Sequence, residues 1–299
     1  MNKYISDLIY FIESIDINKD LLSHENCEIY GDKSKVISTH YISSSQPRKY
    51  SFSINQTAIF MLLDAYVDSL HPNLMNEGFK YKYKKLPESN NCEKIIKGIF
   101  RILRIVRNAL IHEVDALNAK IDTVNITRKK GSKESLRIRR KAINTLNFIV
   151  WYCVKNDLSV YYNELVLVTA YNRLVNGIIQ IEDESGSDVL PVQSDITLKS
   201  FRRYKVTGMK VEELNGKLIL QRKEFLIDFT DDITGIEHKD VTYACSDYLF
   251  DIGEKTYFVP DECLTVSNDK KTGCLPLKDV CKFETNHRVA NTGNLVQPH

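Results

Sequence analysis

Three residues whose side chains can transfer protons and stabilise negative charge fall within one short segment of the chain. Arg107 is followed directly by Asn108, and His112 comes five positions after the arginine. Histidine exchanges a proton near neutral pH, because the unperturbed pKa of this residue type is about 6.5. Arginine stays charged and offers a planar fork of donors to an anionic oxygen. The segment therefore predicts acid–base chemistry beside a bound anion.

This segment belongs to a helix predicted over residues 92–119. One side of that helix carries apolar residues three and four positions apart and is expected to face a core: Ile96, Ile99, Leu103, Val106 and Leu110. The opposite side is expected to carry an exposed cationic stripe: Lys97, Arg101, Arg104, Asn108 and His112. The alternative is an ordinary solvated face, in which Arg107 pairs with a nearby acid and His112 stabilises the helix end.

Other periodic segments predict further helices over residues 3–16, 54–70, 134–156 and 159–181. Short to medium connections between the four longest helices indicate a bundle with its core at about 50–182. The segment FKYKYKK at residues 79–85 alternates rings with lysines and is interpreted as extended, so bases could stack on it or its rings could cover the core. An all-α N-terminal domain is therefore expected over residues 1–184.

The sequence changes character after residue 184, because apolar residues begin to alternate and turn signals become frequent. Asn215-Gly216 separates two alternating runs and predicts a hairpin with a type I′ turn. The runs VTYACSDYLF and KTYFVP predict further strands. The fold class is thus predicted to be α+β, with a β-rich region at 185–284 and a loose tail at 285–299.

The pattern Arg107-Asn108 followed by His112, inside an apolar helix of a bundle, resembles the signature of the HEPN superfamily. Many members of this superfamily are RNA-cleaving toxins or defence proteins. The resemblance implies that Arg107, Asn108 and His112 are catalytic in a metal-independent endoribonuclease that needs no cofactor. The expected products carry 2′,3′-cyclic phosphate and 5′-hydroxyl ends. The resemblance also implies a homodimer, a toxin or antiphage-defence role, and an antitoxin or defence-system partner.

The helical geometry adds a reason for a dimer. Positions 107 and 112 are about 140° apart around an ideal helix, so one helix is not expected to bring both side chains to one phosphate. Two helices paired across a two-fold axis would form a composite site.

A strongly basic segment, RKKGSKESLRIRRK, covers residues 128–141. Binding of the RNA backbone and a solvated linker are both open interpretations. Together with the helix stripe, the segment gives the following candidate RNA-binding residues: Lys97, Arg101, Arg104, Arg128, Lys129, Lys130, Arg137, Arg139 and Arg140.

Composition limits the class of protein. The chain has 299 residues, a net charge of +2 and 43% hydrophobic residues, so it can bury a sizeable core. Its longest apolar run has seven residues and cannot cross a bilayer, and its first residues do not resemble a signal peptide. Seven cysteines without a C-x-x-C pair predict neither a disulfide framework nor a zinc site, and indicate a reducing cytoplasm.

Two other functions are open. The helical bundle could dimerise and hold RNA or a partner protein without cutting RNA. Alternatively, Asp261 and Asp269-Lys270-Lys271 loosely imitate the acidic residues of a metal-dependent nuclease, although the second segment resembles a turn rather than the strand that such a site requires.

Overall fold

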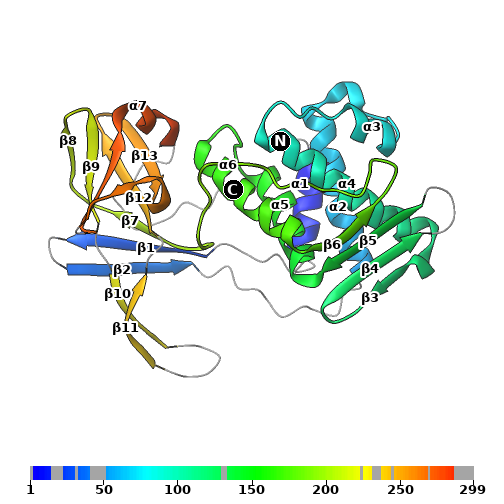
Figure 1. The fold of residues 1–299 in the computed structure, drawn as a ribbon, viewed down its shortest axis with the longest axis horizontal. Helices are drawn as coiled ribbons and strands as arrows, with labels where there is room; N and C mark the ends of the chain where they lie inside the picture. The colour runs from blue at the N-terminus through cyan, green and yellow to red at the C-terminus, as the bar shows by residue number, and fades with distance from the viewer. Residues whose placement is uncertain are drawn as a thin grey trace. The chain divides into compact units, whose positions relative to one another are not determined.

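The computed structural model describes residues 3–14, 23–30, 33–40, 52–128, 133–222, 225–230, 237–243, 246–268 and 270–285. Helices dominate the N-terminal part and strands the C-terminal part, which confirms the predicted α+β class (Figure 1). The chain forms two compact units. Unit 1 comprises Met1–Leu21, Ser43–Leu158 and Asn163–Asp195, and unit 2 comprises Leu22–Ile42, Ser159–Tyr162 and Ile196–His299.

Unit 1 contains the helices that the sequence predicts and a small sheet that it does not. The helices are α1 (Lys3–Ser14), α2 (Phe52–Leu70), α3 (Phe79–Lys85), α4 (Asn91–His112), α5 (Arg140–Lys155) and α6 (Tyr161–Asn176). The antiparallel sheet has the strand order β3 (Leu117–Ala119), β4 (Thr123–Arg128), β5 (Glu134–Arg139) and β6 (Ile178–Glu182). The segment 79–85, predicted to be extended, is the helix α3.

Helix α4 is the central element of unit 1. Its first turn is capped, because the Asn90 side chain accepts a hydrogen bond of 2.9 Å from the Glu93 backbone N–H. The predicted apolar side is buried apart from Leu110, which is half-buried. Gly98 allows a close approach to α6, because a Cβ atom there would overlap the ring of Tyr171. The helix ends at His112 rather than at residue 119.

The sheet explains why three predicted helices end or begin elsewhere. Strand β3 occupies the end of the helix predicted over 92–119. Strand β5 occupies the first six residues of the helix predicted over 134–156, and β6 occupies the end of the helix predicted over 159–181. Along β4, β5 and the last three residues of β6, apolar side chains alternate with polar ones. The apolar face is buried toward the helices, and α4 contacts both β4 and β5 (Figure 1).

The described residues of unit 2 form three sheets. The largest has the order β16 (Glu284–Thr285), β13 (Lys255–Pro260), β12 (Ser246–Ile252), β7 (Arg202–Thr207), β1 (Ser23–Tyr30) and β2 (Lys33–His40). A second joins β14 (Thr265–Val266), β15 (Thr272–Pro276), β9 (Lys217–Gln221) and β8 (Val211–Leu214), and a third joins β10 (Phe225–Thr230) and β11 (Glu237–Tyr243). A short helix, α7 (Leu277–Val280), follows β15.

The predicted hairpin at Asn215-Gly216 is present between β8 and β9. Both residues have positive φ angles, 53° and 72°, as a type I′ turn requires. Gly216 accommodates this backbone without a Cβ penalty.

The predicted domain boundaries differ from the two units. Strands β1 and β2 lie within the predicted helical domain, but β1 pairs in parallel with β7 and therefore belongs to unit 2. Unit 1 also extends to Asp195 rather than to residue 184. Apart from Thr285, the predicted tail lies outside the described residues.

Candidate active site at the end of helix α4

Arg107 and His112 lie together at the C-terminal end of α4. The Nη1 atom of Arg107 is 3.1 Å from the Nε2 atom of His112. Because a guanidinium can only donate, Nε2 accepts in this arrangement and the imidazole proton resides on Nδ1. His112 is exposed, whereas Arg107 is half-buried. The pair therefore combines an accessible proton acceptor with a fixed cation.

The prediction that one helix cannot bring these two side chains together is wrong. The backbone positions are about 140° apart around the helix, but that angle ignores the length of the arginine side chain. A guanidinium at the end of four rotatable bonds reaches the ring of the last helical residue. A composite site across a dimer is thus not required by geometry.

Helix α3 supports Arg107 from one side. The Arg107 guanidinium carbon lies 4.9 Å from the centre of the Phe79 ring, which is a cation–π distance. The alternation in FKYKYKK does not separate rings from lysines onto two faces, because the segment is helical and buries Lys82. Lys82 Nζ donates to Asp64 and Asp68 of α2 at 2.8 and 2.6 Å. These bonds hold α3, and with it Phe79, against the bundle.

Asp64 adds an electrostatic contact to the site. Burial raises the pKa of the Asp64 carboxyl, while the hydrogen bond and charge of Lys82 and the charge of Arg107 act in the opposite direction. The Arg107 guanidinium is therefore close enough to sense this carboxyl, although the two groups do not form an ion pair.

Asn108 connects Arg107 with the sheet. Its Oδ1 atom accepts from Arg107 Nη1 at 3.4 Å, and its Nδ2 atom donates to both carboxylate oxygens of Glu134 at 3.4 Å. Glu134 is 2% exposed and begins β5. Asn108 is therefore a positioning residue here, since its side chain is engaged by two protein neighbours.

The predicted exposed stripe is wrong for Arg101 and Arg104, each of which is 4% exposed. The segment after β6 covers this side of α4. Arg101 Nη2 and Arg104 Nη2 donate to the two carboxylate oxygens of Asp183 at 2.7 and 2.6 Å, and Arg104 Nη1 also reaches Glu134 at 3.2 Å. Both guanidinium groups are buried inside unit 1 as ion-pair partners, because Asp183 and Glu134 supply the negative charge that burial requires.

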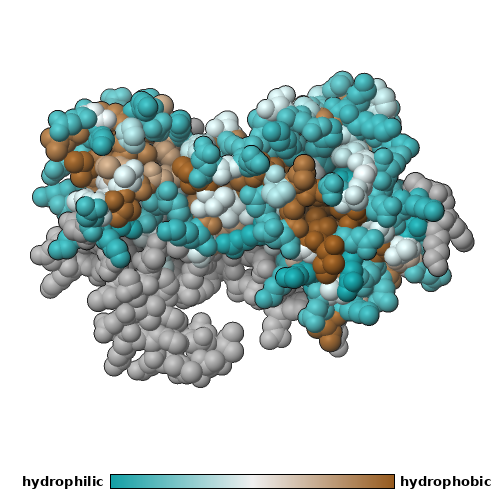
Figure 2. Space-filling model, viewed as in Figure 1, coloured by the Kyte–Doolittle hydropathy of each residue, from teal (hydrophilic) through white to brown (hydrophobic). Residues whose placement is uncertain are grey.

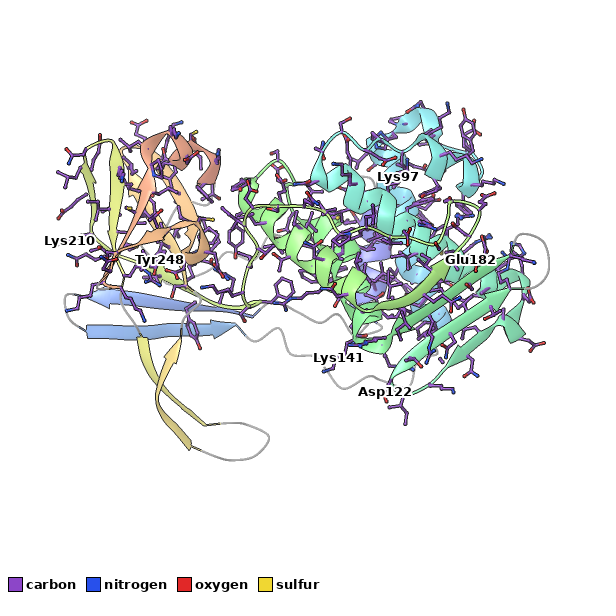
Figure 3. All side chains as sticks on the ribbon, viewed as in Figure 1. Lys97, Asp122, Lys141, Glu182, Lys210 and Tyr248 are labelled. Atoms are coloured by element: carbon purple, nitrogen blue, oxygen red, sulfur yellow. The ribbon has the colours of Figure 1, made fainter. Side chains whose placement is uncertain are left out.

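Lys97, labelled in Figure 3, lies further toward the start of α4. Its ammonium donates to the Glu88 carboxylate at 2.5 Å and to the Leu86 carbonyl at 3.1 Å. Lys97 is therefore engaged within unit 1 and is less available to RNA than predicted.

The basic segment over residues 128–141 contains one paired arginine and several exposed ones. Arg128 is paired with Glu134 and lies 3.9 Å from Glu113. Lys129 and Lys130 lie outside the described residues. Arg137, Arg139 and Arg140 are exposed, although the Arg140 Nε atom donates to the Lys120 carbonyl at 3.3 Å. The cations that remain open to solvent are therefore on β5 and at the start of α5.

Asp261, the first residue of the metal-site alternative, has protein partners. Its carboxylate pairs with Arg222 at 2.7 Å and accepts from the Tyr248 hydroxyl at 3.0 Å. Asp269 lies outside the described residues, and Lys270 has the positive φ of a turn. Within the described ranges, no group of three or more His, Cys, Asp or Glu side chains is placed to hold a metal ion.

Sequence reasoning missed Glu134 and Asp183, the two buried acids that organise the cationic side of α4. A signal for Glu134 was present, because Glu134, Leu136 and Ile138 alternate and therefore share one face of a strand. Asp183 follows Ile181 by two positions, so the same alternation places it on the face of this buried isoleucine.

Comparisons with protein families, with curated proteins and with solved structures found no match to this chain. Among the described residues, no helix combines the length and the apolar character needed to span a membrane.

Proposed function

We propose that the chain is a metal-independent endoribonuclease whose active site is formed by Arg107 and His112. The observation that carries the proposal is the 3.1 Å contact between the Arg107 guanidinium and the exposed His112 imidazole. The resemblance of the Arg-Asn-x-x-x-His segment to the HEPN signature supports the same activity.

In the proposed reaction, the phosphate of an RNA strand binds to Arg107 and separates it from His112. His112 Nε2 then accepts the proton of the adjacent 2′-hydroxyl, and the resulting oxygen attacks phosphorus. Arg107 stabilises the additional negative charge of the five-coordinate phosphorus. The bond to the 5′-oxygen breaks and that oxygen takes up a proton from water, while His112 returns its proton to the solvent. The products are a 2′,3′-cyclic phosphate and a 5′-hydroxyl.

The HEPN-like fold, a homodimer, a cytoplasmic toxin or antiphage-defence role and a partner protein belong to the same proposal. Support for a homodimer comes from α1, which exposes Tyr10 and Phe11 to 76% and 43%. Figure 2 shows an apolar patch in this region of unit 1. Burial of such a patch between two copies would stabilise a dimer.

The second candidate is an RNA-binding scaffold that does not cut its ligand. Arg137 and Arg139 favour it, because both are exposed and neither has an ion-pair partner among the described residues. Cleavage assays separate the two candidates.

The experiment compares wild type with Arg107→Gln and His112→Ala on a single-stranded RNA. Each variant is expected to lose about 100-fold or more in cleavage rate, because general acid–base and charge-stabilising groups each contribute on that order. His71→Ala and Lys94→Gln are the matched controls, since His71 follows α2 and Lys94 lies in the first turn of α4, both elsewhere in unit 1. Melting temperatures should be unchanged in all four. Wild-type cleavage by a folded His112→Ala protein would refute the assignment.

A further inference from the structure

The face of the β4–β6 sheet that points away from the helices is polar. The inward residues Val124, Ile126, Leu136, Ile138 and Ile181 are between 0 and 3% exposed. Six hydrophilic outward residues line a cavity of about 450 Å³, which Arg128, Lys133 and the inward residues Ile126, Glu134 and Leu136 also border: Asn125, Thr127, Ser135, Arg137, Gln180 and Glu182. This volume lies within the range of about 300–1,000 Å³ that small-molecule sites occupy.

Strand register arranges the six outward side chains in two rows, which we call the amide row and the hydroxyl row. In the amide row, Arg137 of β5 lies opposite Asn125 of β4 and opposite Gln180 of β6. In the hydroxyl row, Ser135 lies opposite Thr127 on one side and Glu182 on the other. Neighbouring strands are about 4.8 Å apart and the two rows about 6.8 Å apart, so all six groups border one site.

Most of these groups keep their hydrogen-bonding capacity for a ligand. Gln180 Nε2 donates to Ser135 Oγ at 3.4 Å. Within the described part of the chain, Asn125, Thr127, Arg137 and Glu182 have no hydrogen-bond or ion-pair partner. The buried arginines Arg101 and Arg104 and the half-buried Arg128, by contrast, are all engaged by carboxylates.

We propose that this cavity binds one ribonucleotide unit. Arg137 provides positive charge for a phosphate, and Lys133, which lines the same cavity, adds to the positive charge. Asn125 and Gln180 each offer a donor and an acceptor in one plane, the combination that reads the edge of a base. Glu182, labelled at the end of β6 in Figure 3, is an acceptor for ribose hydroxyl groups.

The carboxylate distinguishes this site from a simple anion site. Glu182 would repel a bare phosphate or sulfate ion held close to it. A nucleotide places its phosphate and its hydroxyl-bearing ribose at different ends, and so can satisfy Arg137 and Glu182 together. Contact with the 2′-hydroxyl would also let the site prefer RNA to DNA.

In taking RNA as the source of the nucleotide, this inference rests on the proposed function. The cavity would hold one nucleotide of the strand and so contribute to affinity and base preference. A free nucleotide has the same chemistry and is the other source to be tested.

The test uses the full chain with His112→Ala, which permits binding without cleavage. Fluorescence anisotropy is measured with labelled single-stranded RNA and with DNA of the same sequence. Arg137→Gln is expected to weaken RNA binding about ten-fold or more, as loss of a charged contact does. Glu182→Gln should lower the preference for RNA over DNA by about five-fold, because the ribose contact then loses its charge. Lys94→Gln and Glu77→Gln are the charge-matched controls and should change neither quantity.

Competition with the four nucleoside monophosphates identifies the source. Weak competition that improves with strand length indicates a strand, and competition as strong as the full RNA indicates a free nucleotide; both agree with a nucleotide site. Unchanged RNA binding by Arg137→Gln overturns the site. A preference for RNA over DNA that Glu182→Gln leaves intact overturns the ribose contact.

Different results would refute the proposed ribonuclease function and the proposed nucleotide site. If His112→Ala abolishes cleavage but Arg137→Gln binds RNA normally, the cavity assignment is wrong and the proposed function stands. If Arg137→Gln weakens binding but the wild-type chain cuts no RNA, the proposed function is wrong and the binding site stands.

Discussion

Both units bury arginines against carboxylates, but the two clusters differ in how completely the arginines are paired. In unit 2, Arg203 is 0% exposed and is held by Asp247 at 2.8 Å and by Glu262 at 2.6 Å. This closed cluster has no exposed member that could meet a ligand, since Asp247 is also fully buried and the Glu262 side chain is 6% exposed.

The cluster in unit 1 is open at one end. Arg101 and Arg104 are paired with Asp183, but Arg107, one turn further along α4, has no ion-pair partner among the described residues. Its contacts are with Asn108, His112 and the Phe79 ring. Identical side chains on one helix thus acquire different roles according to whether an acid reaches them. Substitutions in the paired parts are therefore expected to affect stability, and substitutions at the open end to affect activity.

The largest effect on stability is expected for Asp247→Ala. This change leaves Arg203 buried with half of its negative partners removed, which should cost roughly 3–5 kcal/mol of unfolding free energy. Hydrogen exchange of the β7 and β12 backbone amides reports on this part of unit 2. Lys255→Ala, which breaks an exposed pair with Glu284, is the control and should have no measurable effect. A change for Asp247→Ala no greater than the control would show that the closed cluster does not stabilise unit 2.

A smaller loss is expected for Asp183→Asn in unit 1. The asparagine keeps one oxygen for Arg101 but removes the charge that two buried arginines share, so the loss should be about 3 kcal/mol. The single tryptophan, Trp151, lies in α5 and reports unfolding of unit 1 by its fluorescence. An unchanged denaturation midpoint would contradict the structural role assigned to Arg101 and Arg104.

The smallest expected effect on stability is a loss of unfolding free energy at low pH. Burial alone would raise the pKa of Asp183, but hydrogen bonds from Arg101 and Ser185 and the charge of Arg104 together lower it below its usual value. A carboxyl with a lowered pKa in the folded state stabilises that state above its unfolded pKa of about 3.9, and this contribution disappears as pH falls through the folded value.

The Trp151 transition of wild type should therefore weaken as pH falls below about 4. Asp183→Asn lacks the titrating group, so part of this dependence should be absent from its pH profile. Parallel pH profiles for the two proteins would contradict the assigned ion pairs.

Local signals predicted the parts of the fold that depend on neighbouring residues. The Asn215-Gly216 turn needs only two adjacent residues with positive φ, and the apolar side of α4 follows from helical spacing. Strand β1 could not be predicted in this way, because its partner β7 lies far away in the sequence: Ser23 pairs with Arg202. The parallel pairing leaves no turn signal to detect.

The sequence predicted which residue types form the candidate site, but not how the side chains are arranged or which of them are exposed. The hexapeptide identified Arg107, Asn108 and His112, since their chemistry is evident from the residues alone. Whether Arg101 and Arg104 were exposed depended on Asp183, about eighty positions later, and on the Glu134–Leu136–Ile138 alternation, which was assigned to a helix. Glu134 at the start of β5 and Asp183 just after β6 thus determine which cations remain exposed.

The most direct test of the central claim is an analysis of the RNA ends that the protein produces. RNA with a labelled 5′ end is incubated with wild type and with His112→Ala in excess EDTA, and the new 3′ ends are identified by mass spectrometry. We expect a 2′,3′-cyclic phosphate with wild type, loss of cleavage where a single 2′-deoxynucleotide replaces the cleaved position, and about 100-fold less product or lower with His112→Ala. A 3′-hydroxyl end, cleavage at the 2′-deoxy position, or the cyclic product formed by His112→Ala at the wild-type rate would contradict the proposed function.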